Sequence, residues 1–403
     1  MSALAERWQL DQQRYSWLYG HTDSVAHVEF DEGSGIWNVR GHAEALQVAN
    51  NPHIFSSDTG RLIPQRREFD EGSITQLDPP RHTALRKLVT HAFSPKAIDE
   101  LEPRVHAIVA DLVAEVADRP GFELVGEFAY PLPIVVIAEL LGVPAEDHDL
   151  VNGWVDRMMS ASTEFTLGER DDPGGTADTA ADGVAEAMRQ VRHITDYLRE
   201  HARKRRTTPR DDLLTRLVQA EVDGVRLTEN EVANFANVML VAGHVTTTLL
   251  ISSTVLCLDA YPSVGRAVRA DRALVPGLLE ESLRYLSPIG ALVRVTNAPV
   301  EVGGVLIGPD QMVCVWMPNA NRDERVFVDP YTFDPTREPN PHIAFGRGAH
   351  FCLGAALARR EGRIALNALL DRFPDLRCDP EDPPSFTTNP NLNGVTRLPV
   401  LVS

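Results

Sequence analysis

The chain has few basic residues for its length, and only three of them are lysines. Its 403 residues include 57 acidic side chains against 39 basic ones, which gives a formal net charge of −18. This charge disfavours a nucleic-acid partner, because phosphate binding requires a basic surface. It equally disfavours docking on a membrane of anionic lipid. We interpret the acidic surface as one that keeps the chain in solution.

Cysteine is also scarce, and the sequence has no long apolar run. The four cysteines, at positions 257, 314, 352 and 378, show no disulfide-framework spacing. The N-terminus has no signal-peptide pattern, so we expect a cytoplasmic protein. No apolar run approaches the roughly 20 residues that span a bilayer. The richest run, 130–143, is interrupted by Pro131, Pro133 and Glu139.

The remaining sequence predicts a mainly α protein with small β-sheets. Short β segments are expected at 25–30 and 36–40, after residue 290 and near the C-terminus. No linker or internal repeat divides the chain, so we expect one domain over 1–403. Stretches rich in proline, glycine and acidic residues predict mobile loops at about 51–78 and 160–179. The second loop fits a functional lid and simple disorder equally well.

The longest predicted helix begins after Thr228, where Thr228 and Glu231 form a capping-box pattern. No proline follows until Pro262, so this helix can reach some thirty residues. Its centre, 238–242, is apolar on all sides, and we expect it to be buried. Further helices are expected at 80–93, 276–286 and 352–372.

The most specific pattern surrounds the third cysteine, in the segment Phe345-Gly-Arg-Gly-Ala-His-Phe-Cys-Leu-Gly354. Gly346 and Gly348 allow a tight turn close to a flat cofactor. Cys352 stands at the predicted start of a helix, where free amides favour a thiolate. A lone cysteine in a Gly-rich turn is more often buried and inert. Zinc is disfavoured, because no second cysteine or histidine pair stands at ligand spacing.

The full pattern Phe-x-x-Gly-x-His-x-Cys-x-Gly resembles the haem-binding signature of the cytochrome P450 family. Other motifs of that family occur in the expected order along nearly the whole chain. They are Pro79-Pro80-x-His82-x-x-x-Arg86, Ala242-Gly243-x-x-Thr246-Thr247, Glu281-x-x-Arg284 and the segment 321–337. The resemblance implies a triangular helical prism around a buried haem b. Cys352 would then bind the iron, with Phe345, Gly346 and Gly354 beside the haem.

The same resemblance implies four ligands for the two haem propionates, which are carboxylates that need partners when buried. These ligands are His82, Arg86, Arg294 and His350.

Glu281 and Arg284 would have a structural role in the family, in a buried network with an arginine of the following segment. We expect that arginine to be Arg322 or Arg325.

In the long helix, Ala242 and Gly243 would let the backbone pass close to the haem. Thr246 would offer its hydroxyl to iron-bound dioxygen, although a threonine in a buried helix can simply bond its own backbone. Family members usually carry an acid before this threonine, which relays protons; here the residue is Val245. Our hypothesis is that water on Thr246 and polar groups of the substrate supply protons instead. His244 lies about 200° from Thr246 around the helix and is a weak substitute.

The resemblance also implies a mostly apolar substrate pocket, built from separated segments. Its expected residues are Leu240, Val241, Ile289, Ala291, Leu292, Val293 and Leu392. Such a pocket suits a medium-sized natural product.

We therefore expect a monooxygenase of bacterial secondary metabolism, of the kind found in antibiotic biosynthesis. It would hydroxylate or epoxidise a polyketide-, macrolide- or peptide-like small molecule, using O2 and electrons from a ferredoxin and its reductase. Three alternatives stay open: a substrate bound to a carrier protein, a peroxide-using or non-monooxygenating haem-thiolate enzyme, and a haem protein without turnover. The candidate basic contacts for the ferredoxin are Lys87, Arg359, Arg360 and Arg363.

Overall fold

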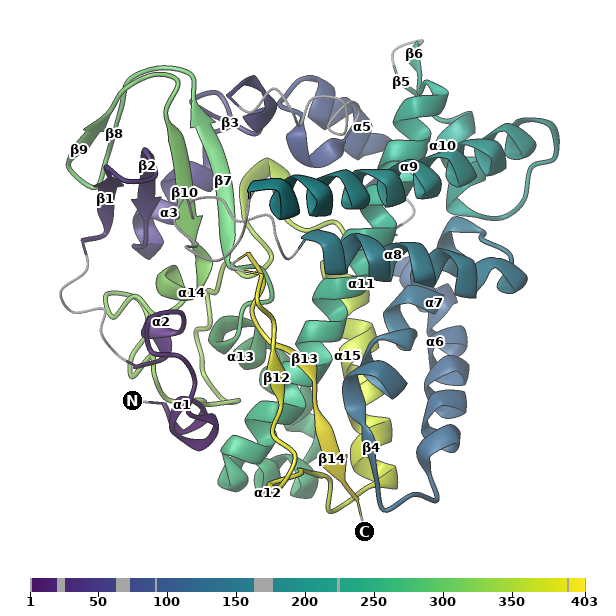
Figure 1. Ribbon diagram of the computed structural model, residues 1–403, viewed down its shortest axis with the longest axis vertical. Coiled ribbons are helices and arrows are strands. Elements are labelled where there is room, and N and C mark those ends of the chain that lie inside the picture. Colours follow the sequence, from purple (N-terminus) through teal and green to yellow (C-terminus); the bar gives the residue numbers. More distant parts are fainter. Residues whose placement is uncertain are drawn as a thin grey trace.

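A computed structural model describes residues 2–19, 26–62, 73–90, 93–162, 177–222, 225–389 and 391–402. Helices dominate it, with small sheets beside them, as the sequence predicts (Figure 1). The helices are α1 (Ala3–Trp8), α2 (Ser16–Tyr19), α3 (His42–Asn50), α5 (Arg81–Thr90), α6 (Pro95–Val116), α7 (Pro131–Leu141), α8 (His148–Ser162), α9 (Ala177–Thr207), α10 (Leu213–Gln219), α11 (Glu229–Ala260), α12 (Pro262–Ala270), α13 (Val275–Tyr285), α14 (Met317–Ala320) and α15 (Ala355–Arg372).

The largest sheet has five strands, in the order β1-β2-β10-β7-β3. Its strands are β1 (Val28–Asp31), β2 (Ile36–Val39), β3 (Phe55–Ser56), β7 (Ala291–Thr296) and β10 (Met312–Trp316). Only the β10–β2 pair is parallel. The sheet buries Val39, Val313 and Val315 in a small core of its own. Its β7 carries Arg294, so the sheet holds one cation of the site described below.

The other strands form small sheets of two or three strands. They are β4 (Gly121–Glu123), β5 (Glu221–Val222), β6 (Val225–Arg226), β8 (Val300–Val302), β9 (Val305–Ile307), β11 (Arg377–Cys378), β12 (Ser385–Phe386), β13 (Val395–Arg397) and β14 (Pro399–Leu401). The three-stranded sheet has the order β11-β14-β4 and joins the C-terminus to the segment before α7.

The long helix α11 has 32 residues and begins with the predicted capping box. The side chain of Thr228 accepts from the amide of Glu231, and the Glu231 carboxylate accepts from the amide of Thr228. Length and composition would let α11 cross a membrane, which corrects the reading that no apolar run is long enough. Inside the fold 72% of its apolar window is buried, so α11 is a core helix.

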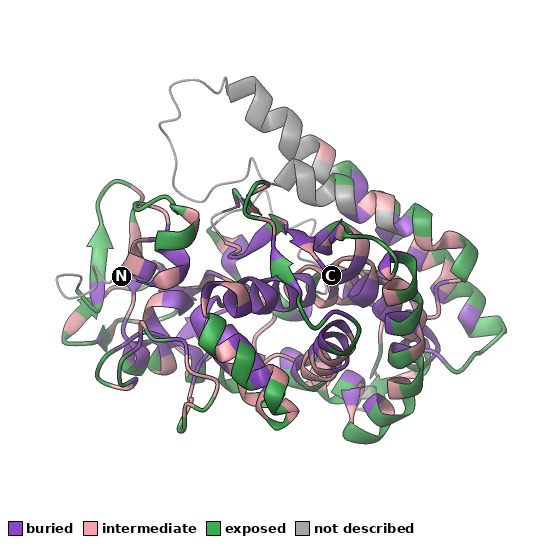
Figure 2. Cartoon of the chain, turned by 90° about the horizontal axis from the view of Figure 1, so that it is seen from below, coloured by how far each residue is buried: buried purple, intermediate pink, exposed green. Residues whose placement is uncertain are grey.

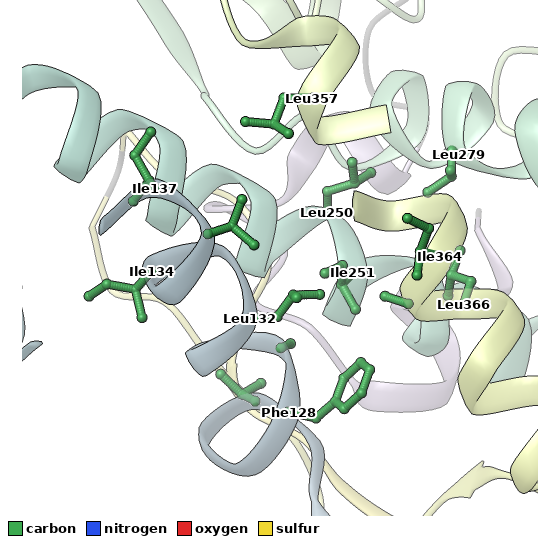
Figure 3. Close-up of a cluster of buried hydrophobic side chains, with 14 of the residues drawn as sticks. Phe128, Leu132, Ile134, Ile137, Leu250, Ile251, Leu279, Leu357, Ile364 and Leu366 are labelled. Atoms are coloured by element: carbon green, nitrogen blue, oxygen red, sulfur yellow. The ribbon is translucent and has the colours of Figure 1, made fainter. Parts of the chain in front are cut away.

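The main core lies between α7, α11, α13 and α15. Figure 3 shows Leu132 of α7, Ile251 of α11, Leu279 of α13 and Leu366 of α15 around it, and all four are almost fully buried. Figure 2 shows the same arrangement for the described residues, with buried residues along the central helices and exposed residues outside. The apolar faces of these helices stabilise the fold by excluding water from their contacts.

Several local predictions need correction. The centre of α11 was expected to be buried on all sides. Leu240 is fully buried, but Ala242 is exposed because its side chain faces a cavity. The last helix begins at Ala355, three residues after Cys352. The 51–78 segment contains β3 and two short helical turns, and its residues 63–72 lie outside the described residues. Of the predicted 160–179 loop, 163–176 also lie outside them.

Candidate active site

The cysteine loop is a tight turn between α14 and α15. Gly346 and Gly348 have φ of 67° and 66°, a left-handed conformation that glycine adopts without strain. A Cβ at Gly348 would also lie only 2.6 Å from the carbonyl oxygen of Ala49. The amide of Cys352 donates to the carbonyl of Phe345 at 2.8 Å and closes the loop. The loop thus holds the sulfur in one place.

The thiol of Cys352 is not activated by its position alone. Burial raises its pKa, and hydrogen bonds from the amides of Gly354 and Ala355 and the charges of Arg86 and Arg359 lower it only in part. The N-terminus of α15 lies three residues after Cys352 and does not by itself stabilise the predicted thiolate. A further positive charge is therefore needed. A metal cation bound to the sulfur would supply the missing charge, since a coordinating thiol is deprotonated outright.

A cavity of about 360 Å³ lies against this loop, between α5, α11, β7 and α15. Cys352, Phe345, Gly346 and Gly354 line it, and a Cβ at Gly354 would project into open space. From α11 it is lined by Val238, Met239, Ala242, Gly243, Thr246, Thr247 and Leu250. This spacing of three and four residues marks one helix face. The lining is mostly apolar.

Some residues expected in the pocket do line this cavity, and others do not. Ile289, Ala291 and Leu292 line it, whereas Val293 does not. Leu240, Val241 and Val245 lie on other faces of α11, out of phase with the lining residues. Leu392 pairs with Ile289 through an isolated β-bridge and stands behind the lining.

Other lining residues were not anticipated from the sequence. They include Ile74, Thr75, Phe93, Ile137, Met317, Leu357 and Glu361. Most are apolar residues with no chemical signature, so only the fold brings them together. Glu361 is the exception, because it is an acid; in the sequence it is hidden in the charged run Arg359-Arg360-Glu361, which resembles a solvated helix face.

Two histidines and two arginines gather at one side of the cavity. His82 and His350 have ring centroids 4.0 Å apart, and Arg86 also lines the cavity. Arg294 lies behind them, and its charge lowers the pKa of both histidines. Burial is the largest cause of the shift in each case and takes the pKa of His350 to about 3.

The cations of this cluster are not paired with carboxylates. Burial lowers the pKa of Arg294 to about 10. The nearby Asp78 raises this pKa in part, but its carboxylate accepts from Ser56 and Ser57. Among the described residues, neither Arg86 nor Arg294 forms an ion pair with a carboxylate. Both ring nitrogens of His82 are buried without a hydrogen-bond partner there. Buried polar groups need partners, so the cluster fits a ligand that carries carboxylates.

The family model for cytochrome P450 matches residues 36–402 of the chain. The chain belongs to the cytochrome P450 family. It is a P450 monooxygenase, and its cofactor is haem b.

Similar P450s include two curated enzymes and a solved structure. Cyclomarin C epoxidase CymV of Salinispora arenicola is 45% identical over 341 residues, which cover 84% of this chain and 83% of the relative. Erythromycin C-12 hydroxylase of Saccharopolyspora erythraea is 39% identical over 373 residues, covering 91% and 89%. The structure of HmtN, a post-tailoring hydroxylase involved in himastatin biosynthesis, has a TM-score of 0.87 and 49% identity over the full length of both chains.

The residues of the cavity fit haem b. The unmatched cations and the orphaned nitrogens of His82 suit two propionates, the space at Gly354 suits a flat macrocycle, and the Cys352 thiol suits iron. This agreement rests on the donor groups that the chain offers.

Behind the cysteine loop, the Glu281–Arg284 pair is completely buried. Arg284 donates to both carboxylate oxygens of Glu281, at 2.7 and 2.8 Å. The third member is Arg337, whose Nε lies 3.2 Å from each oxygen. This corrects the expectation of Arg322 or Arg325, because these two have other partners. Arg322 lies between the rings of Trp17 and Tyr285, and Arg325 pairs with Glu44 and Asp323.

On α11, the hydroxyl of Thr246 donates to the carbonyl of Ala242 at 2.7 Å. This confirms the back-bonding of Thr246. The residue also lines the cavity, and its functional role stays a prediction. His244 points elsewhere: its ring packs against Tyr130 at 4.0 Å, and burial lowers its pKa to about 3. A neutral imidazole on the far side of α11 is no proton relay for this cavity.

Proposed function

We propose that this P450 hydroxylates or epoxidises a medium-sized natural product in bacterial secondary metabolism, with O2 and electrons from a ferredoxin. The observation that carries this proposal is a single apolar cavity with the Cys352 sulfur at one wall and the Ala242-Gly243…Thr246 face of α11 at another. The similarity to cyclomarin C epoxidase, erythromycin C-12 hydroxylase and HmtN supports the substrate class.

In this proposal the residues of the site have separate roles. Cys352 holds the iron, and Phe345, Gly346 and Gly354 leave room for the macrocycle. His82, Arg86, Arg294 and His350 hold the propionates. When bound, a thiolate-ligated haem supplies the O–O cleavage and oxygen-transfer chemistry. The α11 residues Ala242 and Gly243 let the substrate approach, and Thr246 holds a proton at its Oγ1.

The proposed substrate pocket is mostly apolar. Such a pocket selects a bulky natural product by its shape and by excluding water. Ile289, Ala291 and Leu292 would contact the substrate directly. Leu240, Val241, Val293 and Leu392 would act from behind, by fixing α11 and the strand that carries these residues.

The proposed electron donor docks near the cysteine loop. Three of the expected basic contacts have acidic partners: Arg359 pairs with Glu280, and Arg360 and Arg363 both pair with Glu102. Lys87 and Arg347 are exposed and have no such partner among the described residues. We therefore assign the ferredoxin contacts to Lys87 and Arg347, beside the partly exposed Phe351.

One domain over 1–403 and a cytoplasmic location are part of the same proposal. The family match over 36–402 supports the first and the net charge of −18 the second. A carrier-bound substrate remains an option for the same site.

The experiment compares two ways to drive turnover. Purified enzyme is incubated with a panel of macrolide- and peptide-type natural products, once with NADH, ferredoxin and reductase, and once with peroxide alone. We expect oxygenated product with the electron-transfer chain, and incorporation of one atom from labelled O2. Product from peroxide only would instead favour a peroxide-using enzyme, a class that Val245 at the usual acid position also permits.

A further inference from the structure

The chain that leads from α14 into the cysteine loop has little regular structure of its own. Between Ala320 and Ala355, a stretch that the structure describes in full, the one element is the short helical turn Gly348–His350. The hydrogen bonds of a long helix or a sheet therefore do not hold this stretch in place. Contacts from side chains to its backbone take over that role, because buried amides and carbonyls need partners.

The completely buried side chain of Asn321 makes two such contacts. Its Oδ1 accepts from the amide of Ile343 at 2.8 Å, and its Nδ2 donates to the hydroxyl of Ser287 at 2.8 Å, two residues after the end of α13. The carbonyl of Ile343 in turn accepts from the amide of Gly346 at 2.8 Å. One carboxamide thus connects the end of α13 with the first turn of the cysteine loop.

The backbone of Asn321 is fixed as well. Its amide donates to the carbonyl of Met317 at 2.9 Å, and its carbonyl accepts from Nη1 of Arg284 at 3.0 Å. Arg284 belongs to the buried network of Glu281, and Met317 lines the cavity. Every polar atom of Asn321 therefore has a partner, which gives its side chain one orientation.

Ser287 links Asn321 to one wall of the cavity. Nδ2 of Asn393 donates to the carbonyl of Ser287 at 3.0 Å, and the amide of Asn393 donates to the carbonyl of Pro288 at 2.9 Å. Pro288 and Ile289, which follow directly in the chain, line the cavity. Asn393 thus holds this wall, whereas Asn321 holds both the wall and the approach to the cysteine loop.

We propose that Asn321 is a positioning residue, which sets the place of the Cys352 sulfur relative to the cavity wall that begins at Pro288. Without its carboxamide, the amide of Ile343 would lose its buried partner, and the loop would move to find another. Asn321 acts through the backbone of the loop and touches neither iron nor substrate. The inference rests on the proposed role of Cys352 as the iron ligand.

The first test is Asn321→Leu, which keeps the volume and removes both side-chain hydrogen bonds. In the reduced enzyme with carbon monoxide, the ratio of thiolate-type to thiol-type band should fall about fivefold or more, which corresponds to about 1 kcal/mol. Asn321→Asp keeps an acceptor for the amide of Ile343 and should recover most of the thiolate-type band.

The matched control is Asn38→Leu. Asn38 is also buried, and its Oδ1 accepts from Nε1 of Trp316 at 2.7 Å in the large sheet. This change should lower the stability of the fold but leave the carbon monoxide spectrum of the folded enzyme unchanged. A loss of stability alone is thereby separated from a displaced sulfur.

The second test separates the two sides of Asn321 with phenylimidazole, an azole that occupies the substrate side of the haem. Asn393→Leu should weaken its binding about fivefold and keep the thiolate-type band, because only the wall is released. Asn321→Leu should change both the affinity for the azole and the band.

Ser287→Ala decides the case if Asn321→Leu does not fold, since it deletes one hydroxyl and keeps the contact with Ile343. An intermediate loss of the thiolate-type band supports the proposal. A wild-type spectrum and azole affinity in Ser287→Ala, a wild-type spectrum in Asn321→Leu, or an equal loss of the band in Asn38→Leu would overturn it. Failure of the proposed iron ligand would look different, because the wild-type chain itself would then lack the thiolate-type band.

Discussion

The two sides of the cavity treat buried charge in opposite ways. Behind the cysteine loop, the carboxylate of Glu281 accepts from Arg284, Arg337, Asn340 and the amide of Asp334. At the wall between α11 and α15, Glu361 is almost as buried, but its Oε2 has no hydrogen-bond partner in the part of the chain that the structure describes. A satisfied network fixes a loop in place, whereas burial without a partner favours the neutral, protonated form of an acid. The contrast separates a carboxylate that holds the loop from a carboxyl group that burial keeps protonated.

The largest effect is expected on stability, at the Glu281 network behind the cysteine loop. Arg337→Met should lower the free energy of unfolding by about 3 kcal/mol, the lower edge for removing one partner of a buried ion pair, because Arg284 remains. Arg325→Met should cost only about 1 kcal/mol, since its side chain is 45% exposed. Denaturant unfolding of both variants checks this. Equal losses would mean that Arg337 is no special member of the network.

The next effect concerns the cation cluster. Arg294→Met should weaken haem binding about tenfold to hundredfold, which corresponds to one charge-assisted hydrogen bond of about 1.5–3 kcal/mol. The rate of haem transfer to an excess of a haem-scavenging globin measures this. The exposed Arg347→Met is the matched control. If both variants lost haem at the wild-type rate, Arg294 would not contact a propionate.

The unpaired acid should appear in the pH dependence of stability. Burial raises the pKa of Glu361 in the folded chain to about 8, against 4.5 for an ordinary glutamate. The folded state then binds the proton more tightly, so the free energy of unfolding falls as pH rises through this window. Glu361→Gln removes that loss and should gain about 3 kcal/mol on the wild type between pH 5 and pH 8. A pH-independent difference would place Glu361 in a polar environment.

The smallest effect is expected at Val245. Val245→Glu should change the product formed per NADH by about threefold, because it adds an acid beside Thr246. Thr246→Ala should lower the same ratio. If both variants were silent for every substrate, then water on Thr246 and polar groups of the substrate would not supply the protons.

Motifs with fixed spacing predicted the parts of the site that lie near one another in the sequence. The cysteine loop, the capping box of α11 and the Glu281–Arg284 pair were found in this way, because each depends on local backbone geometry. Arg337 was missed because the 321–337 segment is irregular, and several of its arginines are equally close in sequence. Only the packed structure shows which guanidinium reaches Glu281.

The pocket was harder to predict, because the packed structure and not the sequence decides which side chains face it. The helical phase of α11 decides that Ala242 and Thr246 face the cavity while Val241 and Val245 do not. Glu361 was invisible because its neighbours Arg359, Arg360 and Arg363 give the segment the composition of a solvated surface. The fold places their side chains outside and that of Glu361 inside.

The most direct test of the whole account is the spectrum of the reduced enzyme with carbon monoxide. The wild-type chain and Cys314→Ser, a change at a buried cysteine that does not line the cavity, should both give the thiolate-type band. Cys352→Ser should lose that band, and the fold should survive, as judged by unchanged helical circular dichroism. A thiolate-type band that persists in Cys352→Ser would contradict the assignment of the iron ligand and the site built around it.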